Sequence, residues 1–323
     1  MVQGLEEALW RSYRRLVPAR APVLLAVSGG PDSMTLMSAT ARLAGRLGFR
    51  IEAATVDHQL RAESSDEAVR VGVQATSLGL RHHVLLAPVT ATSGVEAAAR
   101  EARYAALAGL RVERGLEQIV TAHTASDQAE TLLMRLARGA ALSGASGIHE
   151  ARRDRVIRPL LFATRADIEA YVAALALPVE RDPMNDDRQF LRVRVRREVL
   201  PALEKAAGPQ VARALARFSA LAAEDDALLE AQATQALSRV RWEDGSLEAE
   251  AITALERPIA RRVLARWLAA QGVELDAELI ADGLKAIETR GTATLPGDRL
   301  LASMNGRVTV RSAPPRVLHA TSP

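Results

Sequence analysis

The sequence predicts an α/β protein in which a doubly wound parallel sheet is followed by a second, smaller and mainly helical domain. Three observations predict this fold class. Residues 23–27 are all apolar, as in a strand that is buried on both faces of a sheet. Strand and helix patterns alternate up to about residue 121, and their connections are too long for hairpins. From about residue 125 onward, the patterns become mainly helical.

The first domain alternates between helical and extended segments. Leu5, Leu9 and Tyr13 have the spacing of one helix face, and Ile51 opens a second extended run. We expect helices at 3–17, 34–47, 64–79 and 95–114, and strands at 23–27, 51–56, 84–86 and 118–121. In a Rossmann-like sheet of this kind, ligands bind at the carboxyl ends of the strands, so the site should lie there.

The remainder of the chain predicts helices and a short β-region. We expect helices at 127–137, 165–176 and 188–205, a long helix at 210–240, and further helices within 249–288. Asn305-Gly306 is a favoured turn pair, so a hairpin is expected around it, and the tail from Pro314 is expected to be loose. The sequence therefore predicts one domain at 1–210 and another at 211–323.

Composition excludes several classes of protein. A chain of 323 residues suits two domains, and an apolar content of 48% supports a sizeable core. The chain has no cysteine, which excludes disulfides, thiolate chemistry and cysteine-bound metal clusters. It begins without a signal-peptide pattern and contains no run of membrane-spanning length. We therefore expect a cytoplasmic protein with no membrane partner.

The basic residues are almost all of one kind. The formal net charge of +3 indicates little about partners by itself. Every basic residue except Lys205 and Lys285 is arginine, whose planar fork suits phosphate groups. A GC-rich genome would produce the same bias, so only local clusters of arginine can indicate a polyanionic partner.

A short polar turn separates the first strand from the next helix, and its sequence is Ser28-Gly29-Gly30-Pro31-Asp32-Ser33. A strand-to-helix turn of small residues points backbone amides and a helix N-terminus at one place, which favours phosphate binding. The two serines add hydroxyl groups and Asp32 adds a carboxylate. No lysine follows the glycines, so this is not a Walker loop. An ordinary tight turn remains the alternative for this stretch alone.

Two further candidates lie at or near strand ends. His58 follows the second strand directly, although a histidine there can equally be structural. Arg103 shares a helix face with Glu96 and Arg100, and the alternative is a solvated face of paired charges.

A third group surrounds the fourth strand's end. His123 closes that strand, and Asp127 and Glu130 share one face of the helix that follows. Paired carboxylates at the mouth of a site can hold an amine or Mg²⁺. Acidic residues in the first turn of a helix are also ordinary capping chemistry.

An arginine-rich segment follows near residue 188. Its basic residues are Arg188, Arg192, Arg194, Arg196 and Arg197. These positions spread around a helix, which suits a phosphate backbone better than a salt-bridged face. Acidic residues nearby keep a structural ion network as the alternative.

The order and wording of these motifs resemble the tRNA(Ile)-lysidine synthase family of PP-loop ATP pyrophosphatases, in its short form. The resemblance covers roughly residues 20–205 and rests on residues 28–33, 56–61, 96–104, 121–131, 134–139, 158–161 and 182–185. The remaining chain is similar, more loosely, to the tRNA-binding domain of that family.

The resemblance implies a two-step reaction. ATP adenylates the C2 oxygen of the wobble cytidine in a tRNA(Ile) with a CAU anticodon, and the side-chain amine of free L-lysine then expels AMP. It also implies ATP and Mg²⁺ as cofactors, and a homodimer is a candidate assembly.

The resemblance also implies roles for individual residues. The loop Ser28, Gly29, Gly30, Pro31, Asp32 and Ser33 would hold the pyrophosphate, with His58 nearby and with Asp32 placing Mg²⁺ or the nucleophile. Charge on the α-phosphate would be stabilised by Arg103 and His123, and the lysine ammonium bound by Asp127 and Glu130. Arg194 and Arg196 would reach the nucleotide or the tRNA backbone.

Three positions depart from the family pattern, namely Thr124, Ser126 and Val193, where a histidine, an acid and an asparagine are usual. Other classes are weighed against the same residues. A tRNA 2-thiolation enzyme would need cysteines, and an amidotransferase-type synthetase would need a further domain. A catalytically silent tRNA-binding paralogue is disfavoured because the loop, His123, Asp127 and Glu130 are all intact.

Overall fold

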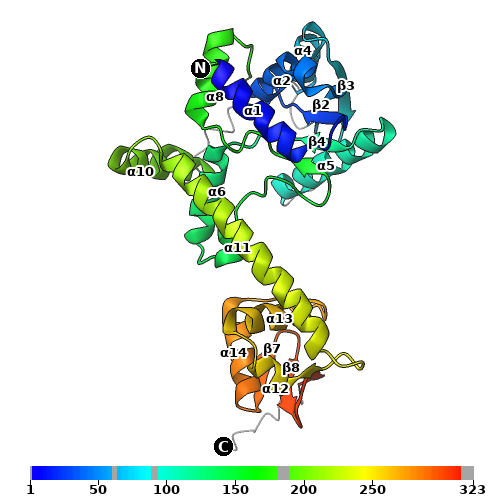
Figure 1. Ribbon diagram of the computed structural model, residues 1–323, viewed down its shortest axis with the longest axis vertical. Coiled ribbons are helices and arrows are strands. Elements are labelled where there is room, and N and C mark those ends of the chain that lie inside the picture. Colours follow the sequence, from blue (N-terminus) through cyan, green and yellow to red (C-terminus); the bar gives the residue numbers. More distant parts are fainter. Residues whose placement is uncertain (1, 60–63, 89–93, 181–188, 314–323) are drawn as a thin grey trace, which may run out of the picture. The chain divides into compact units, whose positions relative to one another are not determined.

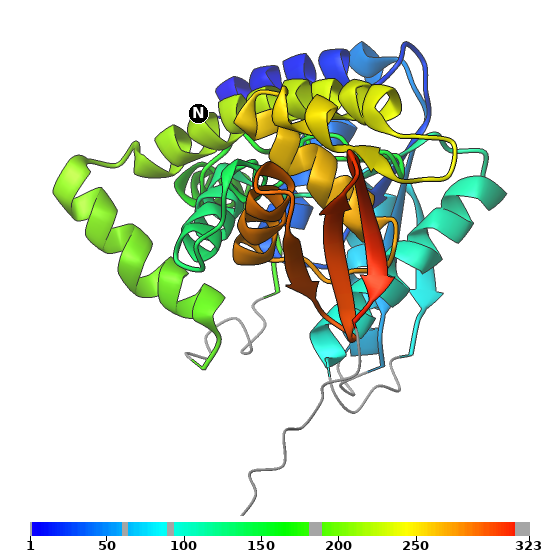
Figure 2. The same ribbon diagram turned by 90° about the horizontal axis from the view of Figure 1, so that it is seen from below.

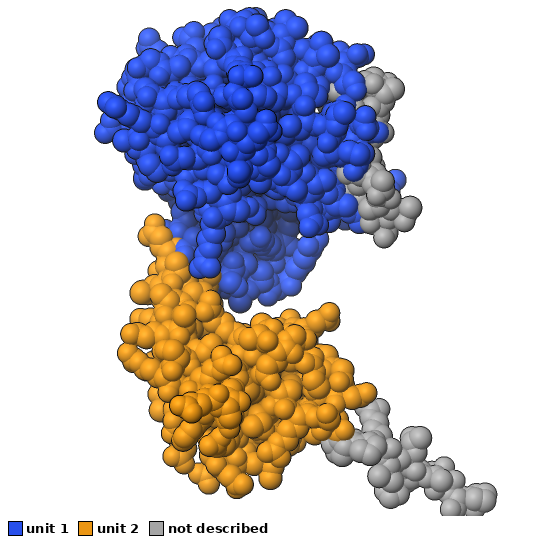
Figure 3. All heavy atoms as spheres, turned by 90° about the vertical axis from the view of Figure 1, so that its right-hand side faces the viewer, with its two compact units in different colours: residues 1–223 blue, residues 224–323 orange. Residues whose placement is uncertain are grey.

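The computed structural model describes residues 2–59, 64–88, 94–180 and 189–313 (Figure 1). The chain forms two compact units, residues 1–223 and 224–323, which Figure 3 shows in different colours. The boundary between the units lies within one long helix, α11 (Val211–Val240). The first unit contains a parallel sheet with flanking helices, and the second is helical with a small antiparallel sheet. The predicted fold class is therefore confirmed.

The first unit is built on a five-stranded parallel sheet in the order β3-β2-β1-β4-β5. Its strands are β1 (Val23–Ala26), β2 (Ile51–Asp57), β3 (Arg81–Leu86), β4 (Gln118–Val120) and β5 (Val156–Ile157). The central strand β1 pairs with β2 on one side and with β4 on the other. The chain order reverses direction between β1 and β4, and such a switch point is where open α/β sheets bind ligands.

Leu24 and Leu25 explain why the first strand is apolar throughout. Side chains alternate across a strand, so these neighbours point to opposite faces of the sheet. Leu24 packs in a cluster with Leu107 and Ile119, whereas Leu25 packs in a second cluster that includes Leu36. Both leucines are fully buried because helices cover both faces of the sheet.

The longer helices of the first unit occur in the order that the sequence predicts, whereas the short α7 lies where no helix was expected. The helices of this unit are α1 (Val2–Leu16), α2 (Pro31–Arg42), α3 (Ala44–Leu47), α4 (Ser64–Ser77), α5 (Val95–Glu113), α6 (Ala125–Leu136), α7 (Leu142–Ala145), α8 (Arg165–Leu175), α9 (Leu191–Arg194), α10 (Leu200–Ala207) and the first part of α11. The two-residue strand β5 is too short to leave a pattern, and no strand was expected there.

The segment expected as one helix at 188–205 is divided in three. The α9 helix continues into a π-helix, η2 (Val195–Val199), which is followed by α10. Pro201 lies in the first turn of α10 and has no backbone N–H, so it cannot donate a hydrogen bond to a carbonyl group of the preceding turn. The wider π turn therefore comes directly before the proline. Residues 181–188 lie outside the described part of the chain.

The second unit packs three helices and the end of α11 around a small sheet. The helices are α12 (Ala249–Thr253), α13 (Arg257–Ala269) and α14 (Ala277–Glu288), and the strands are β6 (Leu247–Glu248), β7 (Thr292–Leu295), β8 (Arg299–Met304) and β9 (Arg307–Ser312). The strands run antiparallel in the order β6-β9-β8-β7, and Figure 2 shows the last three side by side. Asn305 and Gly306 both have positive φ between β8 and β9, which confirms the predicted hairpin. No helix within the described ranges is long and apolar enough to cross a membrane.

Candidate functional site

The turn after β1 depends on a glycine at position 29. Gly29 has φ +84°, a left-handed conformation that side chains other than glycine rarely adopt. Its carbonyl oxygen accepts a hydrogen bond of 3.0 Å from the backbone N–H of Glu180. A Cβ atom there would meet side-chain atoms of Glu180 and Val71 at 3.4 Å. The loop is thus held in its strained shape by the segment that follows α8.

The two serines of the loop fix its other end. The Ser33 hydroxyl donates to the Gly30 carbonyl at 3.0 Å and accepts from the backbone N–H of Ser28 at 3.1 Å. Gly30 is the N-cap of α2 and makes no side-chain cap. A Cβ at Gly30 would meet only the Ser28 hydroxyl, at 3.8 Å. The first amides of α2 therefore face a space that an anion can approach closely.

Asp32 connects this loop to the acidic residues of α6. Burial raises the pKa of Asp32 to about 7, and the negative charges of Asp127 and Glu130 act in the same direction. Arg165 and Arg196 oppose the shift. The structure therefore brings the loop and the predicted acidic pair into one electrostatic site.

Asp32 can offer one carboxylate to a cation. Within the described residues, no group of three or more histidine or acidic side chains could hold a metal ion alone. Mg²⁺ is commonly bound by one or two carboxylates together with nucleotide phosphates. The half-buried carboxylate of Asp32, within the strand-to-helix loop, fits such a shared site.

The Asp127 carboxylate has two tasks. Its Oδ2 accepts hydrogen bonds of 2.9 Å from the backbone N–H and from the hydroxyl of Thr124, the N-cap of α6. The backbone N–H of Asp127 returns a bond to the Thr124 hydroxyl at 3.3 Å, which completes a capping box. Its Oδ1 faces Arg192 at 2.7 Å. Burial would raise the pKa of Asp127, but Arg192, His123 and Thr124 keep it below its usual value.

Two arginines neutralise the acidic pair. Arg192 Nε and Arg196 Nε lie 2.8 and 2.6 Å from the carboxylate oxygens of Glu130, which is only 1% exposed. Arg196 also lies 3.8 Å from Asp127. The interpretation of this arginine pattern as unsuited to salt bridges was wrong for these two residues. They lie four positions apart and share a face, whereas Arg194 between them is exposed.

Arg192 is a site residue that the sequence interpretation did not single out. Its side chain contacts both predicted lysine-binding acids, while the predicted Arg194 contacts neither. The four-residue spacing of Arg192 and Arg196 was the available signal. Their partners lie more than 60 positions earlier in the chain, so only the fold could reveal the pairing.

His123 lies in the connection between β4 and α6, beyond the strand that it was expected to close, and is held as a neutral group. Burial lowers its pKa to about 4, and the positive charges of Arg158, Arg100 and Arg192 add to the shift against the opposing charge of Asp127. Nδ1 of His123 lies 3.0 Å from the Thr121 hydroxyl. At neutral pH this imidazole can donate or accept a hydrogen bond, but it carries no charge.

The other predicted site residues have contacts with residues outside the acidic pair Asp127 and Glu130. His58 follows β2 and places Nδ1 3.0 Å from the carbonyl oxygen of Ala87, beyond β3. The Arg103 guanidinium lies 5.5 Å from the ring centre of Tyr104, and burial lowers its pKa. Glu96 lies on α5, and its side chain is outside the described part of the structure.

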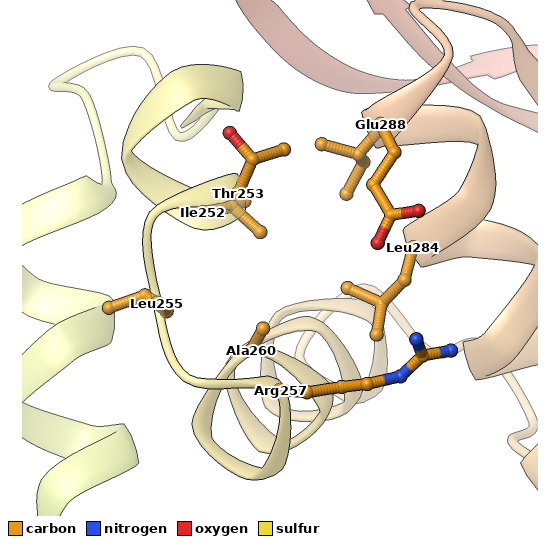
Figure 4. Close-up of a pocket in the computed structure, with 8 residues that line it drawn as sticks. Ile252, Thr253, Leu255, Arg257, Ala260, Leu284 and Glu288 are labelled. Atoms are coloured by element: carbon orange, nitrogen blue, oxygen red, sulfur yellow. The ribbon is translucent and has the colours of Figure 1, made fainter.

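Two cavities lie elsewhere in the molecule. One of about 250 Å³ lies between α12, α13 and α14 of the second unit, with an apolar lining and with Arg257 and Glu288 at its sides (Figure 4). The other, of about 500 Å³, lies in the first unit and borders Tyr171, Asp167 and Arg213. Neither lining contains a residue predicted for the site.

Comparison with known proteins shows the family of this chain. The PP-loop domain family matches residues 5–203. A tRNA(Ile)-lysidine synthase from Salinispora arenicola is 41% identical over 94% of this chain and 95% of its own length. One from Streptomyces coelicolor is 38% identical over 91% of this chain and 88% of its own length. The chain belongs to the tRNA(Ile)-lysidine synthase family.

The lysidine synthase fold also resembles a solved structure from another branch of tRNA modification. The U34-tRNA thiolase NcsA from Methanococcus maripaludis, solved with its 4Fe-4S cluster, matches 68% of this chain and 79% of its own, with a TM-score of 0.58. At 15% identity this likeness shows the fold alone. The present chain has no cysteine to bind such a cluster.

The three departures of this lysidine synthase family member have structural explanations. Thr124 supplies the N-cap hydroxyl of α6. The Ser126 hydroxyl accepts a hydrogen bond of 3.0 Å from the backbone N–H of Arg165, which ties α6 to the start of α8. Val193 is a buried apolar residue of α9, next to the exposed Arg194. Each substitution therefore serves local structure.

Proposed function

We propose that this protein ligates L-lysine to C2 of the wobble cytidine in tRNA(Ile) with a CAU anticodon, using ATP and forming lysidine. The observation that supports the proposal is that Asp32, in the loop 28–33, lies close enough to Asp127 and Glu130 for their charges to raise its pKa. A reaction that joins an ATP-activated base to an amine needs both. The names of the relatives point to the same activity.

In the first step, the C2 oxygen of the cytidine attacks the α-phosphorus of ATP, and the bond to the bridging oxygen breaks. Residues 28–33 hold the leaving pyrophosphate through the loop amides and the N-terminus of α2. Arg103 and neutral His123 donate hydrogen bonds to the α-phosphate oxygens as charge develops on them. Asp32 would help to hold Mg²⁺, which would supply neutralisation of the phosphate charge. The target base must leave its stack to enter the site.

In the second step, the amine of lysine forms a bond to C2, and the bond from C2 to the oxygen of AMP breaks. Asp127 and Glu130 receive the lysine ammonium, which loses a proton before the attack. The two acids already balance the charges of Arg192 and Arg196. The ammonium therefore displaces one guanidinium. Arg192 is the more exposed of the two, and it turns to the nucleotide or RNA phosphates.

The second unit, residues 224–323, serves tRNA binding in this proposal. A tRNA substrate places the enzyme in the cytoplasm. Free lysine is the only other substrate required besides ATP.

The test is ATP–pyrophosphate turnover of the purified chain with a CAU-anticodon tRNA(Ile), with and without lysine. Mass analysis of the anticodon nucleoside accompanies it. A lysine-sized gain on cytidine is expected. Adenylation without that gain would require another nucleophile, and the absence of tRNA-dependent turnover would favour a silent tRNA-binding paralogue.

A further inference from the structure

A second cluster of arginines lies at one tyrosine of α5. The guanidinium groups of Arg100, Arg103 and Arg152 lie 5.2, 5.5 and 5.1 Å from the ring centre of Tyr104. Arg100 and Arg103 belong to α5 itself, whereas Arg152 comes from the segment between α7 and β5. Cation–π contacts hold each guanidinium at the ring, but they do not neutralise its charge.

Arg158 is the buried member of the cluster. It follows β5 directly and is only 2% exposed. One of its terminal nitrogens donates to the carbonyl oxygen of His149, but its Nε has no hydrogen-bond partner. The hydroxyl of Tyr104 is also buried without a partner in hydrogen-bond geometry, although its proximity favours the charged form of Arg158. A buried cation with an unsatisfied donor is costly, and an anion would relieve that cost.

The charge of this cluster is not balanced by carboxylates. Across the described ranges, no acidic side chain pairs with Arg100, Arg103 or Arg158, and Arg152 alone has an ion pair, with Asp154 at 2.7 Å. Burial lowers the pKa of Arg158, and the charges of Arg152 and Arg100 act in the same direction. The four arginines therefore repel one another in the free protein.

The cluster lies beside the catalytic site without belonging to its loop. Arg158 stands at the carboxyl end of β5, and His123 stands at the carboxyl end of the neighbouring strand β4. Arg158 and Arg100 are close enough to His123 to lower its pKa. Arg100 and Arg152 are exposed, so the cluster opens to solvent on one side and ends on the buried Arg158 on the other.

We propose that Arg100, Arg152 and Arg158 form a phosphate subsite around Tyr104 that binds a backbone phosphate of the substrate RNA next to the target nucleotide. This inference rests on the proposed function. In the proposed function the pyrophosphate of ATP is held by residues 28–33 and its α-phosphate by Arg103 and His123. The exposed Arg100 and Arg152 are left for a polymer that arrives from solvent. Because guanidinium groups already surround the Tyr104 ring, we expect the subsite to recognise the charge of a phosphate and not the identity of a base.

The experiment compares the double variant Arg100→Gln/Arg152→Gln with the wild type. Both residues are exposed, so the fold should be retained. Binding of CAU-anticodon tRNA(Ile) is measured by fluorescence anisotropy over a range of salt concentrations, and binding of a non-hydrolysable ATP analogue by calorimetry. We expect RNA affinity to fall about tenfold, and the slope of log K against log salt to decrease by about one for each phosphate group that the variant no longer binds. Affinity for the ATP analogue should stay within about twofold of the wild type, which corresponds to a few tenths of a kcal/mol in binding free energy.

The control is Arg11→Gln/Arg81→Gln, which removes the same charge from exposed positions outside the cluster and should leave the salt slope unchanged. Arg158→Lys tests the buried base of the subsite, because it keeps a charge but loses the planar fork. It should weaken RNA binding while calorimetric melting shows the protein still folded.

Three results would overturn the inference. An unchanged salt slope in the double variant would remove the subsite while leaving the proposed function intact. An equal loss of affinity for the ATP analogue would assign the cluster to ATP instead. A wild-type protein that does not bind the tRNA at all would refute both this inference and the proposed function.

Discussion

Helices α6 and α8 begin with the same structural motif but have different surroundings. Thr124 and Asp127 form a capping box at α6, and Thr164 and Asp167 form the same box at α8. In each box the acid's backbone N–H donates to the threonine hydroxyl at 3.3 Å. Each acid also pairs with an arginine from a later helix at 2.7 Å, Arg192 for Asp127 and Arg213 for Asp167.

The neighbours of the two boxes account for the difference in role. The residue before Thr124 is His123, whereas the residue before Thr164 is Ala163. Three positions after Asp127 stands the buried Glu130, whereas Ala170 stands three positions after Asp167. The α6 box therefore faces a charged site with Asp32, and the α8 box faces a cavity. Capping chemistry and a functional role are compatible in one residue: Asp127 caps α6 and is also the proposed partner of the lysine ammonium.

The largest loss of stability should come from changing Glu130, because α8 has an alanine at the equivalent position. Glu130→Gln removes one of the two carboxylates that balance the charges of Arg192 and Arg196. Because Glu130 is buried, the free energy of unfolding should fall by about 3 kcal/mol. Ligation of lysine should be lost. Glu169→Gln on the surface of α8 is the control and should cost less than about 0.5 kcal/mol. Urea unfolding of both variants decides the comparison, and equal losses would contradict it.

Replacing each of the two capping acids by asparagine tests the comparison directly. Asp127→Asn and Asp167→Asn each weaken a capping box, so each should lower stability by about 1 kcal/mol. Only Asp127→Asn should raise the KM for lysine, by about tenfold or more, because a charged partner of the ammonium is worth at least that much.

Adenylation of tRNA should be largely intact in both variants, as pyrophosphate release without lysine would show. Equal loss of adenylation and lysine use in Asp127→Asn would assign Asp127 to the ATP site. A lysine defect in Asp167→Asn would show that the two boxes are not distinct in function.

The third prediction concerns His123 and pH. Because its folded-state pKa is about 4 and its unfolded value is near 6.5, the folded state favours the neutral imidazole. The resulting stability is present above about pH 6.5 and is lost as pH falls toward 4, by about 3 kcal/mol. His123→Gln should flatten this part of the stability profile. An unchanged profile in urea unfolding between pH 7 and 4 would mean that His123 is not held neutral.

The smallest effect is expected at Arg194, which lies between the two arginines of the acidic pair but is exposed. Arg194→Ala should raise the tRNA concentration needed for turnover by a few-fold, as expected when one phosphate-binding side chain is removed, without changing ATP binding. Arg213→Ala, at the α8 box, is the control and should leave tRNA dependence unchanged. Identical tRNA dependence in both variants would remove Arg194 from the RNA surface.

Local patterns predicted the elements that are long and regular. The alternation of apolar strands and amphipathic helices was enough to predict the parallel sheet, and Asn305-Gly306 was enough to predict the β8–β9 hairpin. The strand β5 was missed because two residues carry no periodicity, and η2 was missed because a π turn depends on Pro201 in its context.

The site was predictable where its residues are close in sequence. The loop 28–33 and the Asp127–Glu130 pair each follow from local spacing. The contact of Glu130 with Arg192 and Arg196 joins residues more than 60 positions apart, and no local pattern encodes such a pairing. The same holds for Arg158 beneath Tyr104.

The π turn η2 makes the length of its segment critical. One additional residue in a helical turn rotates everything before it by about 100° relative to everything after it. On one side of the turn Arg192 faces Glu130, and on the other Leu200 is buried with Ala129. Both contacts reach the same helix, α6. Deleting a single residue from 195–199 would therefore rotate Arg192 by about 100° relative to Leu200, so the two contacts could not both keep their present geometry. This stretch should tolerate substitutions far better than changes in length.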